Sequence, residues 1–339
     1  MQNIYLTGDI NLLNINDPTQ PFRHLKPVLQ PADMIFSNLE CCFYDTARAG
    51  TVKGLEGFYV PTRLVEALED GGITAVGLAN NVNYGAEAIQ SSCQTLRQHG
   101  IRFAGAGPNA KDAYQPIIVE QNGLKIGFLQ RSSIFWTANH MALHNSPGIA
   151  VIKGHTAYQP TLPHKPGSPP LIHTWADPTH LANFKETIAV LRPAVDLLIS
   201  SHHWGLRDEV LDYQVEIAHA AIDAGADVVM GHGAHMPLPI ELYKGKPIFY
   251  GLAHLFFLMG HGGKRQTGDG LISKIGVENG QIIQIGFSMV QTTDDNESIP
   301  IVGKALESRV KELQAACRSL GSRLEIEGND VVVYFESEE

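Results

Sequence analysis

The stretch that decides the fold is Val228-Val229-Met230-Gly231-His232-Gly233-Ala234-His235-Met236-Pro237. Its apolar, β-branched start predicts a buried strand that ends at Gly231. Two histidines, His232 and His235, follow in a glycine-containing turn. Because α/β proteins bind ligands at the carboxyl ends of their strands, this spacing lets two imidazoles reach one metal centre.

Potential metal ligands also follow other strand-like runs. Aspartate, glutamate, asparagine and histidine side chains are the donors that divalent metals use in proteins. If the runs are neighbours in one fold, five strand ends meet in one site. The four further segments are Thr7-Gly8-Asp9, Ser37-Asn38-Leu39-Glu40, Ala79-Asn80-Asn81 and Ser201-His202-His203-Trp204-Gly205.

Composition narrows the class of protein. The chain has 339 residues, 44% of them hydrophobic and 18% charged, as expected of a globular protein with a large core. Its net charge of −10 argues against nucleic-acid and anionic-membrane partners. The first residues enter a strand directly, without the features of a secretion signal, and no apolar run of roughly 18 residues could span a membrane. We expect a cytoplasmic protein with a small-molecule or peptide-like substrate; the sequence does not indicate an oligomeric state.

Strand and helix patterns alternate along most of the chain, which predicts an α/β fold. The late hairpins imply a second, more antiparallel sheet packed behind the first. We expect strands at 3–8, 33–38, 74–78, 196–200, 227–230 and 330–335, hairpins at 117–130, 239–250 and 271–289, and helices at 21–29, 62–70, 86–98, 178–191, 212–224 and 304–318.

Two segments stand apart from this pattern. Residues 299–339 are predicted to form a small C-terminal helix-strand extension after a main domain of residues 1–298. Residues 131–178 lack periodicity, so we expect an inserted loop that lies over the site as a lid, with Phe135 and Trp136 facing the metal. The histidines of this loop are expected to be exposed: His140, His144, His155, His164 and His173.

An ordered set of motifs resembles the CapA family, named for poly-γ-glutamate capsule synthesis, within the calcineurin-like metallophosphoesterase superfamily. The likeness covers about residues 3–290. It implies a four-layer α/β/β/α sandwich with one or two divalent ions (Mn, Zn, Fe or similar) at the strand ends. The motifs are Gly8-Asp9, Asn38-Leu39-Glu40, Leu78-Ala79-Asn80-Asn81, His203-Trp204-Gly205, Gly231-His232-x-x-His235 and Tyr250-Gly251-Leu252.

Carried over position by position, the resemblance implies a centre for two ions. A carboxylate bridge suits the roughly 3.5–4 Å spacing of two-metal hydrolases, and borderline divalent metals suit imidazole and carboxylate donors. The implied ligands are Asp9 and His235 on the first ion, Glu40 as the bridge, and Asn81, His203 and His232 on the second ion.

The sequence departs from the family pattern at four places. Val82 stands where superfamily phosphoesterases carry a histidine that protonates the leaving group. Asn11 stands where other members place a first-metal histidine. The last two departures replace a His-Trp-Gly-x-Glu motif and a Leu-Gly-Asn-Phe motif; here they read His203-Trp204-Gly205-Leu206-Arg207 and Leu252-Ala253-His254-Leu255.

Four further residues are assigned to the site. His202 and His254 are candidates for proton transfer, with an orienting or structural role as the alternative for each. Asn80 and Arg207 are candidates for substrate binding, although Asn80 could equally be a turn residue and Arg207 a solvated side chain.

The predicted function is a metal-dependent hydrolase, in which a metal-activated water attacks an ester, amide, lactone or phosphoester. Ordinary phosphodiester cleavage is disfavoured, because Val82 cannot donate a proton. Two alternatives stay open. One is an epimerase or isomerase that combines a Lewis-acid metal with histidine proton transfer, and the other is a non-catalytic accessory protein of polymer synthesis.

Overall fold

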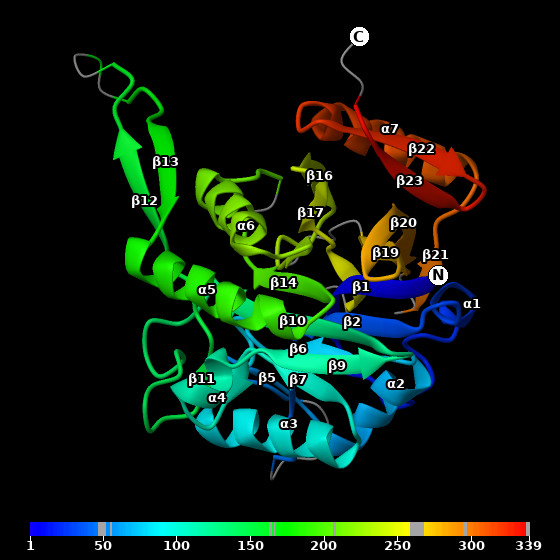
Figure 1. Cartoon of the computed structure of the whole chain (residues 1–339). Coiled ribbons are helices and arrows are strands. Elements are labelled where there is room, and N and C mark those ends of the chain that lie inside the picture. The colour runs from blue at the N-terminus through cyan, green and yellow to red at the C-terminus, as the bar shows by residue number, and fades with distance from the viewer. Residues whose placement is uncertain are drawn as a thin grey trace.

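The molecule is a sandwich of two β-sheets with helices on both outer faces (Figure 1). The computed structural model describes residues 1–46, 52–54, 56–162, 165, 167–205, 208–257, 268–293 and 297–336. The predicted four-layer α/β/β/α architecture is confirmed. No helix in these ranges is both long and apolar enough to cross a membrane.

The first sheet has ten strands. Its parallel part contains the N-terminal strand, and its antiparallel part contains the C-terminal strands. In spatial order the strands are β22 (Ser322–Glu327), β23 (Asp330–Phe335), β20 (Gln281–Thr292), β19 (Asp269–Glu278), β1 (Gln2–Asn11), β2 (Met34–Leu39), β6 (Ala75–Gly77) and β7 (Arg102–Ala104), with β18 (His254–Phe257) beside β1 and β21 (Ser298–Pro300) beside β20.

The second sheet has six strands: β16 (Leu238–Tyr243), β17 (Lys246–Gly251), β15 (Val228–His232), β14 (Leu197–His203), β10 (Leu124–Ser132) and β9 (Ile117–Gln121). The late hairpins do not share one sheet, because β16–β17 joins this sheet while β19–β20 joins the first. The prediction of a separate, more antiparallel sheet is therefore wrong, and both sheets are mixed.

Helices α2 (Val65–Asp70) and α3 (Ala86–Gln98) pack on the first sheet, while α5 (Pro178–Leu191) and α6 (Asp212–Ala224) pack on the second. The start of α5 is encoded locally. The Asp177 carboxylate accepts hydrogen bonds from the backbone of Thr179 and His180, and Pro178 occupies the first turn. The remaining short elements are α1 (Lys26–Leu29), α4 (Ala110–Tyr114), η1 (Thr62–Leu64), η2 (Arg192–Ala194), β3 (Cys42–Phe43), β4 (Val52–Lys53), β5 (Phe58–Val60) and β8 (Ala106–Gly107).

The central core lies between the two sheets. Phe36 of β2 and Phe128 of β10 stack there with ring centroids 4.6 Å apart. Strand β2 is buried along its whole length, because one face meets the other sheet and the opposite face meets the helices. This double burial explains why the parallel strands read as continuous apolar runs.

The segment 131–178 is more ordered than expected. It contains β11 (Gly148–Ile149) and the antiparallel pair β12 (Gly154–Gln159) and β13 (Leu171–Ala176). That hairpin projects from the body in Figure 1, so the prediction of a lid is wrong for this part. The two strands pair with each other and leave most of their side chains exposed, while the base of the hairpin is joined to α6 by hydrogen bonds from the Ala176 N–H to Glu216 and from the Tyr213 N–H to Thr174.

The first half of the segment does return to the strand ends. Trp136, at 44% exposed, donates its indole N–H to the Asn81 carbonyl at 3.0 Å. His140 is buried, contrary to the expectation for the loop histidines, and its Nε2 lies 2.9 Å from the Asn83 carbonyl oxygen. His164 lies outside the described residues.

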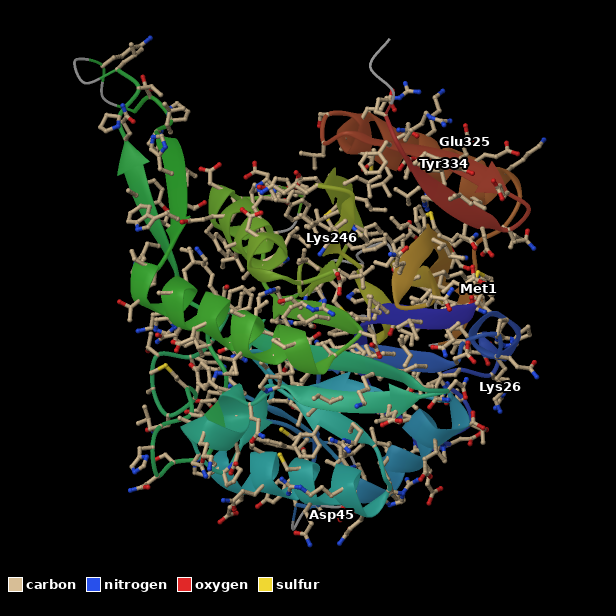
Figure 2. All side chains as sticks on the ribbon, viewed as in Figure 1. Met1, Lys26, Asp45, Lys246, Glu325 and Tyr334 are labelled. Atoms are coloured by element: carbon tan, nitrogen blue, oxygen red, sulfur yellow. The ribbon has the colours of Figure 1, made fainter. Side chains whose placement is uncertain are left out.

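The C-terminal residues continue the first sheet. β23 pairs with β20, and α7 (Lys304–Arg318) buries Leu306, Val310, Leu313 and Cys317 in the core between the sheets. Glu325 and Tyr334 lie on the outer side of this region (Figure 2). The predicted boundary near residue 298 therefore falls within one continuous sheet.

This packing makes the whole protein sensitive to α7. Leu306→Ala should lower the free energy of unfolding by about 2–5 kcal/mol, because a leucine side chain is removed from a close-packed core. The measurement is chemical denaturation followed by fluorescence and circular dichroism. An unchanged main transition would mean that the C-terminal helix folds as a separate unit.

Candidate metal centre

The predicted metal ligands meet at the carboxyl ends of neighbouring strands. Asp9 lies near the end of β1, Glu40 directly follows β2, and His203 and His232 end β14 and β15. All four side chains are buried, with at most 1% exposed. The strands β1 and β2 run parallel, as do β14 and β15, so their ends lie on one edge of the sandwich.

His203 and His232 face each other across the two strands. Their Nδ1 atoms lie 3.0 Å apart, and His203 Nε2 lies 2.7 Å from the amide oxygen of Asn81. A Cβ at position 233 would come within 2.8 Å of the His203 ring, so Gly233, with a φ of 97°, leaves room for this imidazole. The structure thus brings together three of the residues assigned to the second ion.

Asp9 connects this pair to a second pair of histidines. Its Oδ1 lies 3.5 Å from His232 Nδ1, and its Oδ2 lies 3.8 Å from His235 Nδ1. His235 Nδ1 in turn lies 2.8 Å from Nε2 of His254. Asn38 donates to Oδ1 at 2.8 Å, which holds the carboxylate in place.

The electrostatics of the centre call for a cation. Burial and the charge of Asp9 raise the pKa of Glu40 well above its usual range, and burial likewise raises the pKa of Asp9. In the described ranges no lysine or arginine forms an ion pair with either carboxylate, and Glu40 Oε2 has no hydrogen-bond partner there. A bound divalent ion would supply the missing positive charge, so these residues fit such an ion.

The imidazoles are suited to the same task. Burial and the neighbouring histidines hold the pKa values of His203 and His254 well below the usual range, and burial does the same for His232. Neutral imidazole is the form that coordinates metal. The mixed nitrogen and oxygen donors suit ions such as Mn, Zn or Fe.

Two residues of the centre escaped the sequence prediction. Ser201 Oγ lies 2.9 Å and Gln130 Nε2 lies 3.2 Å from His232 Nε2, so the other ring nitrogen faces Asp9 and His203. Ligating histidines usually hold their second nitrogen in this way. The signal in the sequence was weak: Gln130 is one polar residue at the end of an apolar strand.

His202 does not belong to the cluster, so the structure does not bring this predicted catalytic residue to the metal-binding side chains. Side chains alternate along β14, so His203 faces the centre while His202 faces the helical layer. There its ring stacks on Trp204 with centroids 4.6 Å apart, and its Nε2 lies 2.8 Å from Ser200 Oγ. Burial lowers its pKa to about 3.

Asn80 is likewise misplaced for contact with a substrate. Its amide group donates to Asn38 Oδ1 and the Leu39 carbonyl, and its oxygen accepts from the backbone N–H groups of Val82 and Asn83. The buried amide is therefore fully used in shaping the turn after β6. The other predicted substrate contact, Arg207, lies outside the described residues.

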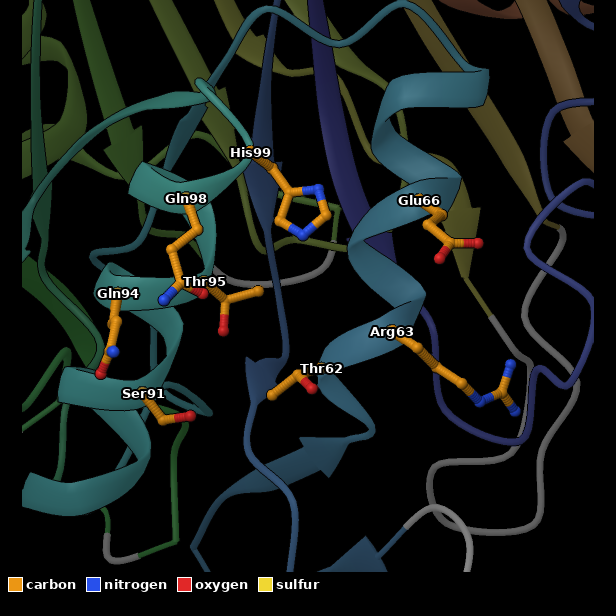
Figure 3. Close-up of a pocket in the computed structure, with 8 residues that line it drawn as sticks. All are labelled: Thr62, Arg63, Glu66, Ser91, Gln94, Thr95, Gln98 and His99. Carbon is orange, nitrogen blue, oxygen red and sulfur yellow. The ribbon is translucent and has the colours of Figure 1, made fainter.

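A separate pocket of about 350 Å³ lies between η1–α2 and α3 (Figure 3). Arg63, Glu66 and His99 are among its lining residues. It contains none of the residues assigned to the metal centre.

Neighbouring residues on opposite faces of β14 allow a matched test. His203→Phe should remove most bound metal, while His202→Phe should leave the metal content unchanged.

The low pKa of His202 also means that the folded state binds fewer protons than the unfolded state between about pH 6.5 and pH 3. The wild type should therefore lose stability relative to His202→Phe as the pH falls through that window. Elemental analysis and denaturation at several pH values measure both effects, and equal metal loss in the two variants would contradict the assignment of faces.

The family comparison agrees with the motif pattern. The model of "Bacterial capsule synthesis protein PGA_cap" matches residues 3–257. Capsule biosynthesis protein CapA of Bacillus anthracis is 25% identical over 245 residues, which cover 70% of this chain and 54% of that protein. A "Probable polyglutamine synthesis accessory protein" of Mycobacterium tuberculosis is 30% identical over 181 residues, covering 51% and 42%. The chain thus spans about half the length of these relatives.

Solved structures are similar only at a low level. A hypothetical protein from Thermus thermophilus superposes with a TM-score of 0.49 at 16% identity, covering 86% of this chain and 99% of that one. A novel phosphatase from Mycoplasma pneumoniae gives a TM-score of 0.43 at 14% identity, covering 92% and 98%. Neither likeness bears on function. The family match covers most of the chain, and the chain belongs to the bacterial capsule synthesis protein PGA_cap family.

Proposed function

We propose that this protein is a metal-dependent hydrolase that acts on an amide or ester bond of a peptide-like substrate. The observation that carries the proposal is the burial of Asp9 beside Glu40, without a lysine or arginine ion pair in the described ranges, together with the imidazoles that face Asp9. The names of relatives, which refer to capsule and polyglutamine synthesis, support a peptide-like polymer as the substrate class.

The residues of the centre would have two kinds of role in such a reaction: some would bind the ion, and others would position those ligands. Asp9, Glu40, Asn81, His203, His232 and His235 would hold one or two ions, and a bound ion supplies Lewis-acid activation of water and of the attacked carbonyl. Asn38 positions the carboxylate of Asp9, while Ser201 and Gln130 position His232. The surrounding apolar core keeps bulk water from the buried donors, which strengthens their electrostatic effect.

The positions of the two candidate histidines disfavour the isomerase alternative. An isomerase of the kind considered needs a histidine that moves a proton at the metal. His202 faces the opposite side of the sheet, and Nδ1 of His254 has no hydrogen-bond partner in the described parts of the chain.

A non-catalytic role is the second candidate, and the "accessory" names of relatives favour it. Metal content separates the two functions, because a decayed centre should hold less than one ion per chain after purification without a chelator. Release of an amine or alcohol from model amide and ester substrates then tests catalysis directly.

Glu40→Gln tests the proposed electrostatics. The change should weaken metal binding at least tenfold, because the ligand loses its charge, and it should abolish hydrolysis. The metal-free variant should nevertheless be as stable as the metal-free wild type or more stable, because a buried carboxyl group that lies beside Asp9 without a cationic partner has been replaced by a neutral amide. Thermal unfolding with and without EDTA, together with elemental analysis, gives both readouts. Full metal occupancy in Glu40→Gln would contradict the site.

Val82 sets the expected limit on phosphodiesterase activity. Its side chain is buried in the apolar cluster under α3, so a histidine there would enter the core and should reduce stability without restoring activity. We expect alkyl phosphodiesters, whose leaving group needs a proton, to be cleaved about 10²–10⁴-fold less well than by an enzyme with a positioned acid. Aryl esters, with a better leaving group, should be much less affected.

The measurement compares the hydrolysis rates of an alkyl and a p-nitrophenyl phosphodiester that differ only in the leaving group. Val82→Ala is the control, and it should leave the ratio of these two rates unchanged. Efficient cleavage of the alkyl substrate by the wild type would show that no acid at position 82 is needed.

A further inference from the structure

We propose that His254 is a metal ligand and that, with His235 and Oδ2 of Asp9, it forms a second cation position beside the one at His203 and His232. The inference rests on the proposed function, because it assumes that the centre binds a divalent ion. It changes the role of His254 from a proton donor to a ligand, and it makes Asp9 the carboxylate shared by the two positions.

Two groups of donor atoms carry this inference. Asp9, His203 and His232 form one group, and Asp9, His235 and His254 form the other; within each group one donor atom per residue lies within 4.8 Å of the others. His235 Nδ1 and His254 Nε2 are only 2.8 Å apart, much like the 3.0 Å between the Nδ1 atoms of the first pair. Asp9 directs a different oxygen toward each pair.

The backbone around His254 holds its ring beside Asp9. In the pairing of β1 with β18, Asp9 stands opposite His254, and the Asp9 N–H donates to the Ala253 carbonyl at 2.7 Å. Gly8 permits this approach, since a Cβ there would lie 1.9 Å from that carbonyl oxygen. Ala253 and His235 both adopt left-handed conformations, with φ of 55° and 60°. Such conformations are unfavourable for residues with a Cβ and are typical of functional sites.

His254 also compensates for a donor that the first strand lacks. The motif resemblance implies a first-metal histidine at the position of Asn11, and the amide oxygen of Asn11 accepts a hydrogen bond from the Leu13 N–H at 2.9 Å. That oxygen is therefore used in a local turn. An imidazole from the neighbouring strand β18 takes over the donor function that position 11 has lost.

The surroundings of His254 disfavour the alternative role in proton transfer. A general acid must be reprotonated after every turnover, through solvent or through its second nitrogen. His254 is 1% exposed, and its Nδ1 has no hydrogen-bond partner in the described part of the protein. One face of its ring stacks on Phe257 with centroids 4.6 Å apart. A buried ring that offers only Nε2 toward Asp9 and His235 is suited to coordination.

The test is a titration of the metal-stripped chain of residues 1–339 with Zn²⁺, read by calorimetry and by elemental analysis after desalting. The wild type should bind two ions and His254→Ala one, with the affinity of the second position reduced more than about 100-fold. That loss exceeds the 10–100-fold typical of a residue that only orients a ligand. His254→Gln should show the same loss, and circular dichroism in EDTA should show that both variants are folded.

Two matched variants complete the design. His203→Ala should remove the other ion, and Asn11→Ala should keep both. The inference is overturned if His254→Ala and His254→Gln still bind two ions, or if the wild type binds one ion whose affinity neither change affects; either result leaves the proposed hydrolase intact. A wild type that binds no Zn²⁺ would contradict the proposed function itself.

Discussion

The centre depends on the burial of two carboxylates at the same strand ends. Asp9 and Glu40 are removed from water, and the charge of Asp9 further raises the pKa of Glu40. A fold that places two acidic groups in this environment requires either protons or a cation to neutralise them. The facing imidazoles are neutral for the same reason, because burial lowers their pKa values. The low-dielectric interior therefore creates both a pair of carboxylates that a divalent cation would neutralise and the neutral imidazoles that could hold such an ion.

The parallel strands bring the side chains that meet this requirement to one edge of the sandwich. Adjacent parallel strands end on the same edge, so residues far apart in the sequence become neighbours; His203 Nε2 and the amide oxygen of Asn81 lie 2.7 Å apart although 122 positions separate them. Alternation along β14 then decides which of two adjacent histidines faces the centre. The core between the sheets, which includes the stacked pair Phe36 and Phe128, keeps the two sheets in contact and the strand ends aligned across the sandwich.

Local patterns allowed much of this to be predicted from the sequence. Helices 86–98, 178–191, 212–224 and 304–318 were predicted with the observed bounds, because their apolar spacing and terminal residues act within one helix. The sequence also predicted which residues follow the strand ends: Asp9, Glu40, Asn81, His203 and His232. The sequence did not reveal that His202 points toward the helical layer or that the Asn80 amide is consumed by hydrogen bonds within a turn. Both features depend on strand register and on hydrogen-bond partners from other strands. The hairpin of β12 and β13 was missed because its exposed side chains lack a regular apolar alternation.

The exposure of the site residues defines how solvent reaches the centre. Asp9, Glu40, His203, His232 and His254 are almost completely buried, whereas the His235 side chain is 28% exposed and Asn81 is partly exposed. Trp136 lies next to this edge, since its indole N–H binds the Asn81 carbonyl. Among the residues that the structure describes, an imidazole, an amide and an aromatic ring lie at this approach. These three side chains are compatible with the amide or ester substrate that we propose, because a neutral group needs no charged partner at the approach to the buried carboxylates.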